Sequence, residues 1–217
     1  MEYHSHARRI LLFGASGRTG ALVLAMALEA GNEVTAVVRN AAKLSVDHPN
    51  LTIVEGDSTV FSSFKDAAKG KDTLVSCIGV SSNGPTTLYS QSTSNMLKAM
   101  GGAGIRRILC VSAAGIETNP KLPFVHRFIS KHIVQRVFRH PYADCRSMEA
   151  MLRESNTEWT AVRPPMLQNR SFTGKYRYRA NGWLAHCIRI NRADLACFLL
   201  ESIDNPETYR AVVEVAN

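Results

Sequence analysis

Three glycines near the start of the chain, Gly14, Gly17 and Gly20, constrain its fold more than any other feature. They follow an apolar run at residues 10–13 and precede good helix formers at residues 21–30, so the stretch predicts a strand, a tight turn and a helix. In this arrangement the first glycine turns the chain, the second lets a phosphate approach the backbone, and the third packs the helix on the strand. The N–H groups that begin the helix attract anions. The stretch therefore predicts a dinucleotide site, the alternative being a glycine turn without a ligand.

Length and composition fit a single globular α/β domain spanning residues 1–217, with 45% hydrophobic and 20% charged residues. No apolar run is long enough to span a membrane. Because the first residues lack a signal peptide's apolar stretch, we expect a cytoplasmic protein. The net charge of +8 suits anionic cofactors and substrates as well as nucleic acid, but no nucleic-acid motif is present. We therefore expect a small-molecule partner, no nucleic acid and a monomer.

The cysteines and the first histidines give no sign of a metal site. The five cysteines contain no Cys-x-x-Cys pair, which favours reduced thiols over disulfides or zinc. His4 and His6 lie in a stretch, residues 1–7, that reads as a loose tail. We expect no bound metal.

The end of the second expected strand, residues 33–39, bears on the choice of cofactor. An NAD site usually places an acid there to hold the ribose hydroxyls. Here the strand ends in Arg39, Lys43 follows one turn later, and no acid occurs before Asp47. The pattern favours a 2′-phosphate and hence NADP, the alternative being basic side chains that are merely solvated.

Strands and helices alternate along the rest of the chain, which predicts a doubly wound parallel sheet with ligands at the carboxyl ends of its strands. Further strands are expected at residues 51–54, 73–78, 106–111, 158–163 and 209–215, with a small outer strand at 174–179. Further helices are expected at residues 60–69, 86–103, 141–155 and 191–202. Asp57, after the third strand, is placed either to accept a hydrogen bond from adenine or to cap the helix at 60–69.

Residues 121–140 carry a possible apolar stripe with basic side chains around it. The stripe consists of Phe124, Phe128, Ile129, Ile133, Val134, Val137 and Phe138. The pattern favours a helix docked on the domain with a solvated basic face. A membrane-surface or nucleic-acid helix is the alternative.

Seven stretches together resemble the atypical short-chain dehydrogenase/reductases. They are GASGRTG, VVRN, EGD, CIG, VSAAG, MLRESNTEWTAVRPP and NRADLACFLL. Within that family the sequence is most similar to the NADPH-dependent flavin reductase and biliverdin-IXβ reductase group, and more distantly to the NmrA-like proteins. The resemblance implies a Rossmann fold with a small C-terminal substrate lobe, and NADP as cofactor.

The same resemblance implies roles for individual residues. The pyrophosphate would be bound by Gly14, Ser16, Gly17, Arg18 and Thr19. The 2′-phosphate and adenine would lie against Arg39, Lys43, Asp57 and Ser58. The ribose path and nicotinamide would be lined by Cys77, Ile78, Gly79, Pro164, Pro165 and Met166. Ser112, which ends the fifth strand, would be catalytic by orienting the acceptor or the carboxamide.

The tyrosine–lysine pair of most short-chain dehydrogenases is missing. Tyr142 and Arg146 form a near match, but alignment on the downstream MLRES places Pro141 and Cys145 at the two positions. Hydride transfer to a flavin needs no tyrosine, because solvent can supply the proton. We therefore expect an NADPH-dependent reductase of a small planar acceptor such as a flavin, a quinone or a tetrapyrrole. The alternatives are a non-catalytic NADP(H) sensor that acts through a protein partner, and a carbonyl reductase that uses Tyr142.

Overall fold

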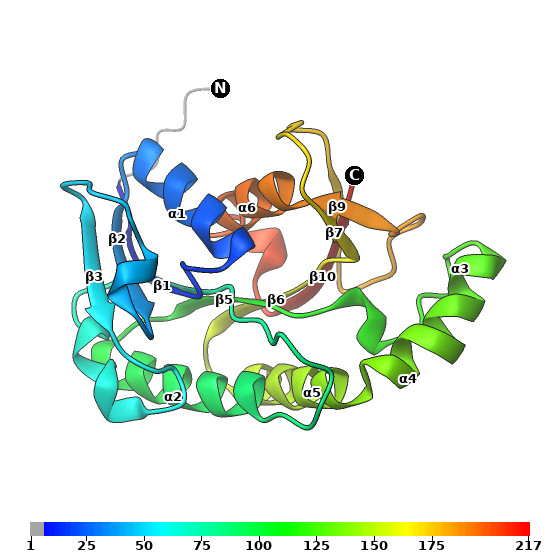
Figure 1. The fold of residues 1–217 in the computed structure, drawn as a ribbon, viewed down its shortest axis with the longest axis horizontal. Helices are drawn as coiled ribbons and strands as arrows, with labels where there is room; N and C mark the ends of the chain where they lie inside the picture. The colour runs from blue at the N-terminus through cyan, green and yellow to red at the C-terminus, as the bar shows by residue number, and fades with distance from the viewer. Residues whose placement is uncertain (1–6) are drawn as a thin grey trace.

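The computed structural model describes residues 7–217. His4, His6 and the rest of the expected tail before Ala7 lie outside this range. Among the described residues, an eight-stranded sheet has the order β3-β2-β1-β4-β5-β6-β10-β8 (Figure 1). Every pairing is parallel except that of β8 with β10, which is antiparallel. The strands are β1 (Arg9–Phe13), β2 (Glu33–Val38), β3 (Leu51–Glu55), β4 (Thr73–Ser76), β5 (Arg107–Val111), β6 (Glu158–Arg163), β8 (Arg177–Ala180) and β10 (Ala211–Ala216).

Helices cover both faces of the sheet, as the doubly wound prediction requires (Figure 1). α1 (Arg18–Glu29) and α6 (Arg192–Glu201) pack side by side on one face, while α2 (Leu88–Ala103) and α5 (Arg139–Glu154) pack on the other. The central strands are therefore buried on both sides, which explains why every residue of β1 after the exposed Arg9 is apolar. The predicted fold class is confirmed.

The chain moves outward from β1 through β2 to β3 and then returns to β4 on the other side of β1. This reversal makes the carboxyl ends of β1 and β4 the switch point at which such sheets bind ligands. The helices α2 and α5 are tied together near this edge. The buried carboxylate of Asp144 in α5 accepts hydrogen bonds from the N–H groups of Tyr89 and Ser90, so α5 caps the start of α2.

Two parts of the fold differ from the sequence prediction. The helix expected at residues 60–69 is a pair of short 3-10 turns, η2 (Phe61–Ser63) and η3 (Lys65–Ala68). The hydroxyl of Ser63 accepts from the Asp57 N–H and lies 2.7 Å from the Val60 carbonyl, and such local bonds compete with α-helix formation. Two three-residue strands, β7 (Met166–Gln168) and β9 (Arg189–Asn191), form a small separate sheet that is too short to leave a sequence pattern.

The helix expected at residues 121–140 has the predicted solvated basic face, but it is not continuous and most of its apolar stripe is exposed rather than buried against the domain. The segment folds as α3 (Phe124–Ile129), a π-helical stretch η5 (Ser130–Val134) and α4 (Gln135–Val137), and projects from the end of the domain in Figure 1. None of its residues is buried. Amphipathicity alone does not specify what covers the apolar side chains, so the sequence pattern did not decide the matter. No helix within residues 7–217 combines the length and apolar character needed to cross a membrane.

Arg107 holds the amino-terminal edge of the sheet together. Its guanidinium is buried at the start of β5 and donates to the backbone carbonyls of Ser202, Ile203 and Glu158. It also lies over the ring of Tyr209, 4.4 Å from the centroid. Burial lowers the pKa of Arg107 to about 10. One side chain thus joins β5 to the start of β6 and to the segment after α6.

We expect Arg107→Met to lower the free energy of unfolding by about 2–4 kcal/mol, because it leaves several buried carbonyls without donors. The neighbouring Arg106→Met is the matched control. The Arg106 side chain is 76% exposed and pairs with Glu158 at 3.3 Å, so its loss should cost less than about 1 kcal/mol. Urea denaturation of both variants measures the difference. Equal stabilities would contradict the role assigned to Arg107.

Candidate functional site

The glycine turn between β1 and α1 is built by very close backbone contacts. Gly14 has a φ of +79°, and a Cβ placed on it would lie 2.6 Å from the carbonyl oxygen of Cys77. A Cβ on Gly20 would lie 2.1 Å from the Gly14 oxygen. Both glycines are therefore required by the protein's own packing. At Gly17 the nearest atom to such a Cβ is the Gly14 oxygen at 3.2 Å, which leaves its outer side open for a ligand.

The start of α1 is electrostatically prepared for an anion. Gly17 is the N-cap residue, no side chain caps the helix, and its first turn contains no acidic residue. The first N–H groups therefore keep their partial positive charge. Arg18 adds a positive charge to this end of the helix. Burial lowers the pKa of Arg192, at the start of α6, and the nearby charge of Arg18 lowers it further. A pyrophosphate fits these features well.

A cavity of about 320 Å³ extends from this turn along the carboxyl ends of the first strands. It brings together most of the residues that the sequence predicts for the cofactor: Gly14, Ser16, Gly17, Arg39, Lys43, Asp57, Ser58, Cys77, Ile78 and Gly79. Lining residues that the sequence reading missed are Phe13, Val37, Val38, Gly56 and Leu88. Most of these belong to the same strand ends, so strand boundaries could have indicated them. Arg18 lines a neighbouring cavity with Arg192, and Thr19 lines neither.

The polar groups at the far end of this cavity are available to a ligand. Arg39 and Lys43 are exposed, and among the described residues neither belongs to an ion pair. Asp57 binds the side chain and backbone of Thr59 through one oxygen, at 2.7 and 2.8 Å. These bonds lower the pKa of Asp57, and the charge of Arg39 lowers it further. Asp57 thus forms a local turn, and its second oxygen has no hydrogen bond within residues 7–217.

A larger, apolar cavity of about 620 Å³ lies beyond the ends of β5 and β6. Pro164, Pro165 and Met166, which the sequence predicts beside the nicotinamide, line it. Residues 124–138, which project from the domain (Figure 1) and are called the projecting segment from here on, supply one wall. The side chains that line the cavity from this segment are His126, Ile129, Ser130, Val134 and Phe138. The remaining wall includes Ala113, Ala114, Gly115, Asn119, Leu122, Tyr142, Cys187, Ile188 and Glu214. The chamber is suited to an apolar or aromatic molecule.

Ser112 does not line this cavity, although the next two residues, Ala113 and Ala114, do. Its hydroxyl is nearly buried and donates to Glu149 of α5 at 2.8 Å. The same carboxylate accepts from Arg163 at 2.7 Å, and Arg163 also binds Glu117. Burial disfavours the charge of Arg163, but its bonds to Glu149 and Glu117 outweigh this and raise its pKa. The contact gives Ser112 a structural partner, and its predicted catalytic role stays a prediction.

Tyr142 lines the apolar cavity, whereas Arg146 points elsewhere and donates to the Ile116 carbonyl at 3.1 Å. Burial, followed by the nearby Cys145, raises the pKa of Tyr142. In a tyrosine–lysine pair the cation acts in the opposite direction and makes the phenol a better acid. Within residues 7–217 the one cation that the near match offers, Arg146, is therefore bound to a backbone carbonyl rather than to the Tyr142 hydroxyl. Pro141 and Cys145 are both buried in α5.

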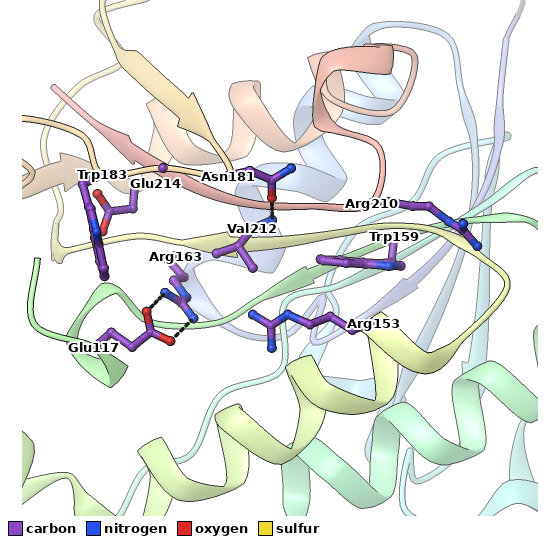
Figure 2. A pocket seen from close by; sticks show the side chains of 10 residues that line it. Glu117, Arg153, Trp159, Arg163, Asn181, Trp183, Arg210, Val212 and Glu214 are labelled. Atoms are coloured by element: carbon purple, nitrogen blue, oxygen red, sulfur yellow. Dashed lines mark hydrogen bonds and ion pairs between the residues drawn. The ribbon is translucent and has the colours of Figure 1, made fainter.

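A third cavity, a polar cleft of about 470 Å³, is lined by both tryptophans of the chain, Trp159 and Trp183. Figure 2 shows Arg153, Arg163 and Arg210 around it. Glu214 lines both this cleft and the apolar cavity.

The carboxyl group of Glu214 is buried, and its two oxygens differ. Oε2 accepts from the Asn119 side chain at 2.8 Å and from the Leu184 N–H at 2.7 Å. Oε1 is buried and has no hydrogen-bond partner among residues 7–217. Burial raises the pKa of Glu214. The sequence reading missed this residue, although an acid within the apolar strand YRAVVEV is an identifiable signal.

Comparison with known proteins places the chain in context. Residues 14–206 match a family model described as NAD(P)H-binding. YwnB, an uncharacterized protein of Bacillus subtilis, is 24% identical, and the match covers 92% of this chain and 93% of YwnB.

Solved structures of similar proteins confirm the fold. A short-chain dehydrogenase/reductase from Veillonella parvula, solved in complex with NADP, has a TM-score of 0.79 at 18% identity, covering 98% of this chain and 95% of its own. The anaerobillin reductase ChuY from Escherichia coli O157:H7 has a TM-score of 0.77 at 23% identity, covering 96% of both chains. Within the described residues, no cluster of three or more His, Cys, Asp or Glu is arranged to hold a metal ion.

Proposed function

We propose that this protein reduces a small planar acceptor with NADPH. The premise is its family: the chain belongs to the NAD(P)H-binding family of the atypical short-chain dehydrogenase/reductase type. The observation that carries the proposal is the pair of cavities along one edge of the sheet. One spans the strand ends from β3 to β4 and the other lies beyond β5 and β6. An extended dinucleotide bound in the first would reach the second with its nicotinamide.

The glycine cradle fits the phosphates of such a cofactor. Gly17 leaves space where a Cβ would stand in the way, and the uncapped start of α1 offers N–H donors. Arg39 and Lys43 would bind a 2′-phosphate, which favours NADP over NAD. Pro164, Pro165 and Met166 would hold the nicotinamide face against the apolar cavity. When bound, the nicotinamide supplies a hydride to the acceptor.

The acceptor cavity favours flavins, quinones or tetrapyrroles over small polar carbonyl compounds. Its walls are mainly apolar, with few polar groups to orient a ligand. Enclosure between Pro164, Pro165 and the projecting segment would exclude water and align a flat ring. Orientation of two rings is most of what such a reduction requires. One of the similar structures, ChuY, is named an anaerobillin reductase, which supports a reductase activity for this fold.

Glu214 would supply the proton that accompanies the hydride. A protonated carboxyl would donate through Oε1, the oxygen that has no protein partner, after a shift of the side chain that exposes this buried atom to the acceptor. In this structure Oε2 is bound to Asn119 and Leu184. The proton moves from Oε1 to a heteroatom of the acceptor and leaves a carboxylate. Solvent that enters the polar cleft, which Glu214 also lines (Figure 2), would then return the proton. Tyr142, whose pKa burial raises, has no role in this transfer.

The cofactor preference is tested by calorimetric titration with NADPH and NADH. A charge-assisted bond to the 2′-phosphate should make NADPH bind at least about tenfold more tightly, since about 1.4 kcal/mol corresponds to tenfold. Arg39→Ala combined with Lys43→Ala should remove the preference and leave NADH affinity unchanged. Lys71→Ala, before the amino end of β4, is the matched control. Equal affinities in the unmutated protein would refute the assignment.

Reductase activity is tested by the loss of NADPH absorbance with FMN, riboflavin, quinones and biliverdin as acceptors. We expect turnover in the unmutated protein and in Tyr142→Phe, and none in Gly17→Val, whose side chain enters the phosphate cradle. Gly101→Val is the matched control, because a Cβ there meets nothing within 4 Å. Tight NADPH binding without turnover would favour the sensor. Ketone reduction that is lost in Tyr142→Phe would favour the carbonyl reductase.

The role of Glu214 predicts a pH dependence. Because the protonated form donates, the rate should be highest below its raised pKa and should fall as pH rises through that value. Glu214→Gln keeps the shape but donates only weakly, so its rate should fall about a hundredfold and lose this pH limb. NADPH affinity should not change. A Gln variant with unaltered rate and pH profile would identify solvent as the proton source.

A further inference from the structure

The projecting segment, Phe124 to Phe138, exposes an unusual amount of apolar surface. Among residues 7–217 eleven large apolar side chains are exposed, and seven of them lie in this segment. They are Phe124, Val125, Phe128, Ile129, Ile133, Val137 and Phe138, of which Phe124 is 72% exposed. Such a cluster marks an interaction surface, since single exposed side chains elsewhere need no explanation.

The charge around this surface has one sign. Lys121, Arg127, Lys131, Arg136 and Arg139 lie in or beside the projecting segment. No carboxylate occurs between residues 118 and 143, and all five basic side chains are exposed. Arg127 lies over the ring of Phe124, and His132 packs against Phe128 at 4.6 Å between ring centroids. Basic and apolar groups thus share one surface.

We propose that the projecting segment docks on the surface of a lipid bilayer that contains anionic lipids. The side chains that do not line the apolar cavity would enter the boundary between headgroups and acyl chains, namely Phe124, Val125, Phe128, Ile133 and Val137. The five cations would meet lipid phosphates. The net charge of +8 on the whole chain attracts it to the same surface.

Other occupants fit the observations less well. A second copy of the protein, related by a two-fold axis, would bring the same five cations face to face. Nucleic acid would satisfy the charges but not Val125, Ile133 and Val137, which have no ring to stack on bases. A bilayer with anionic lipids satisfies both the charges and the aliphatic side chains.

The inner side of the projecting segment gives this docking a consequence. His126, Ile129 and Val134 form one wall of the apolar cavity beyond β5 and β6. Gln135 ties the segment to the domain by donating to the Gly115 carbonyl and the Thr118 hydroxyl, both at 3.2 Å. Docking would therefore bring the cavity close to the bilayer, where a lipophilic acceptor dissolves. The docking itself does not depend on the reaction proposed above.

The experiment is co-sedimentation of the full chain with vesicles, either of phosphatidylcholine alone or of phosphatidylcholine with phosphatidylglycerol. We expect binding only to the anionic vesicles, weakened by salt. Phe124→Ser combined with Phe128→Ser should reduce binding at least about tenfold, because two exposed rings leave the interface. Phe172→Ser, another half-exposed phenylalanine, should bind as the unmutated protein does. An intact NADPH titration and melting temperature show that the double variant is folded.

Charge is tested with Lys131→Glu against Lys65→Glu, which change the net charge equally at exposed positions. Only Lys131→Glu should weaken vesicle binding, by about tenfold. Equal losses would mean that overall charge, not this surface, drives binding, and would overturn the proposal. It is also overturned if vesicles do not bind, if light scattering finds a dimer that the phenylalanine variant dissociates, or if the segment binds a DNA duplex instead.

Discussion

The close contact of backbone at Gly14 is the constraint on which the site depends. The turn after β1 passes so near the Cys77 carbonyl at the end of β4, and so near Gly20 of α1, that neither Gly14 nor Gly20 has room for a side chain. This contact fixes the start of α1 over the switch point of the sheet. The helix N–H groups, the strand ends and the first cavity consequently share one edge. Every other part of the candidate site is arranged along that edge.

The fold and the set of residues that line the first cavity could be predicted because their signals are local. Glycine spacing, an apolar strand and the residues just after each strand lie within short stretches of sequence, and parallel strands then gather those stretches at one edge. The apolar cavity could be predicted only in part, at Pro164, Pro165 and Met166. Its other walls come from the loop after β5, the projecting segment, α5 and β10. No local pattern states that such distant segments meet.

Glu149 and Glu214 show why the sequence did not predict the roles of the polar groups near the apolar cavity. Both acids are buried on the sheet face that carries α5, but of the two only Glu149 forms ion pairs, with Arg163 and Arg153. Glu149 also accepts a hydrogen bond from the Ser112 hydroxyl. A fully bonded carboxylate stabilises structure, whereas Glu214 keeps one oxygen without a partner. The sequence shows Ser112 at a strand end, where a functional residue is expected. It does not show that the Ser112 hydroxyl is hydrogen-bonded to Glu149.

The projecting segment shows the opposite limit of sequence reasoning. An apolar stripe with basic neighbours describes a helix docked on a domain and a helix docked on a membrane equally well, because periodicity records a buried face without naming what buries it. The structure separates the two by exposure, since Phe124, Val125 and Phe128 have no apolar partner within the domain's buried core. The π-helical stretch at Ser130–Val134 shifts the side-chain positions along the segment. One side of the segment lines the apolar cavity while the other remains exposed, so a single element contributes to two surfaces.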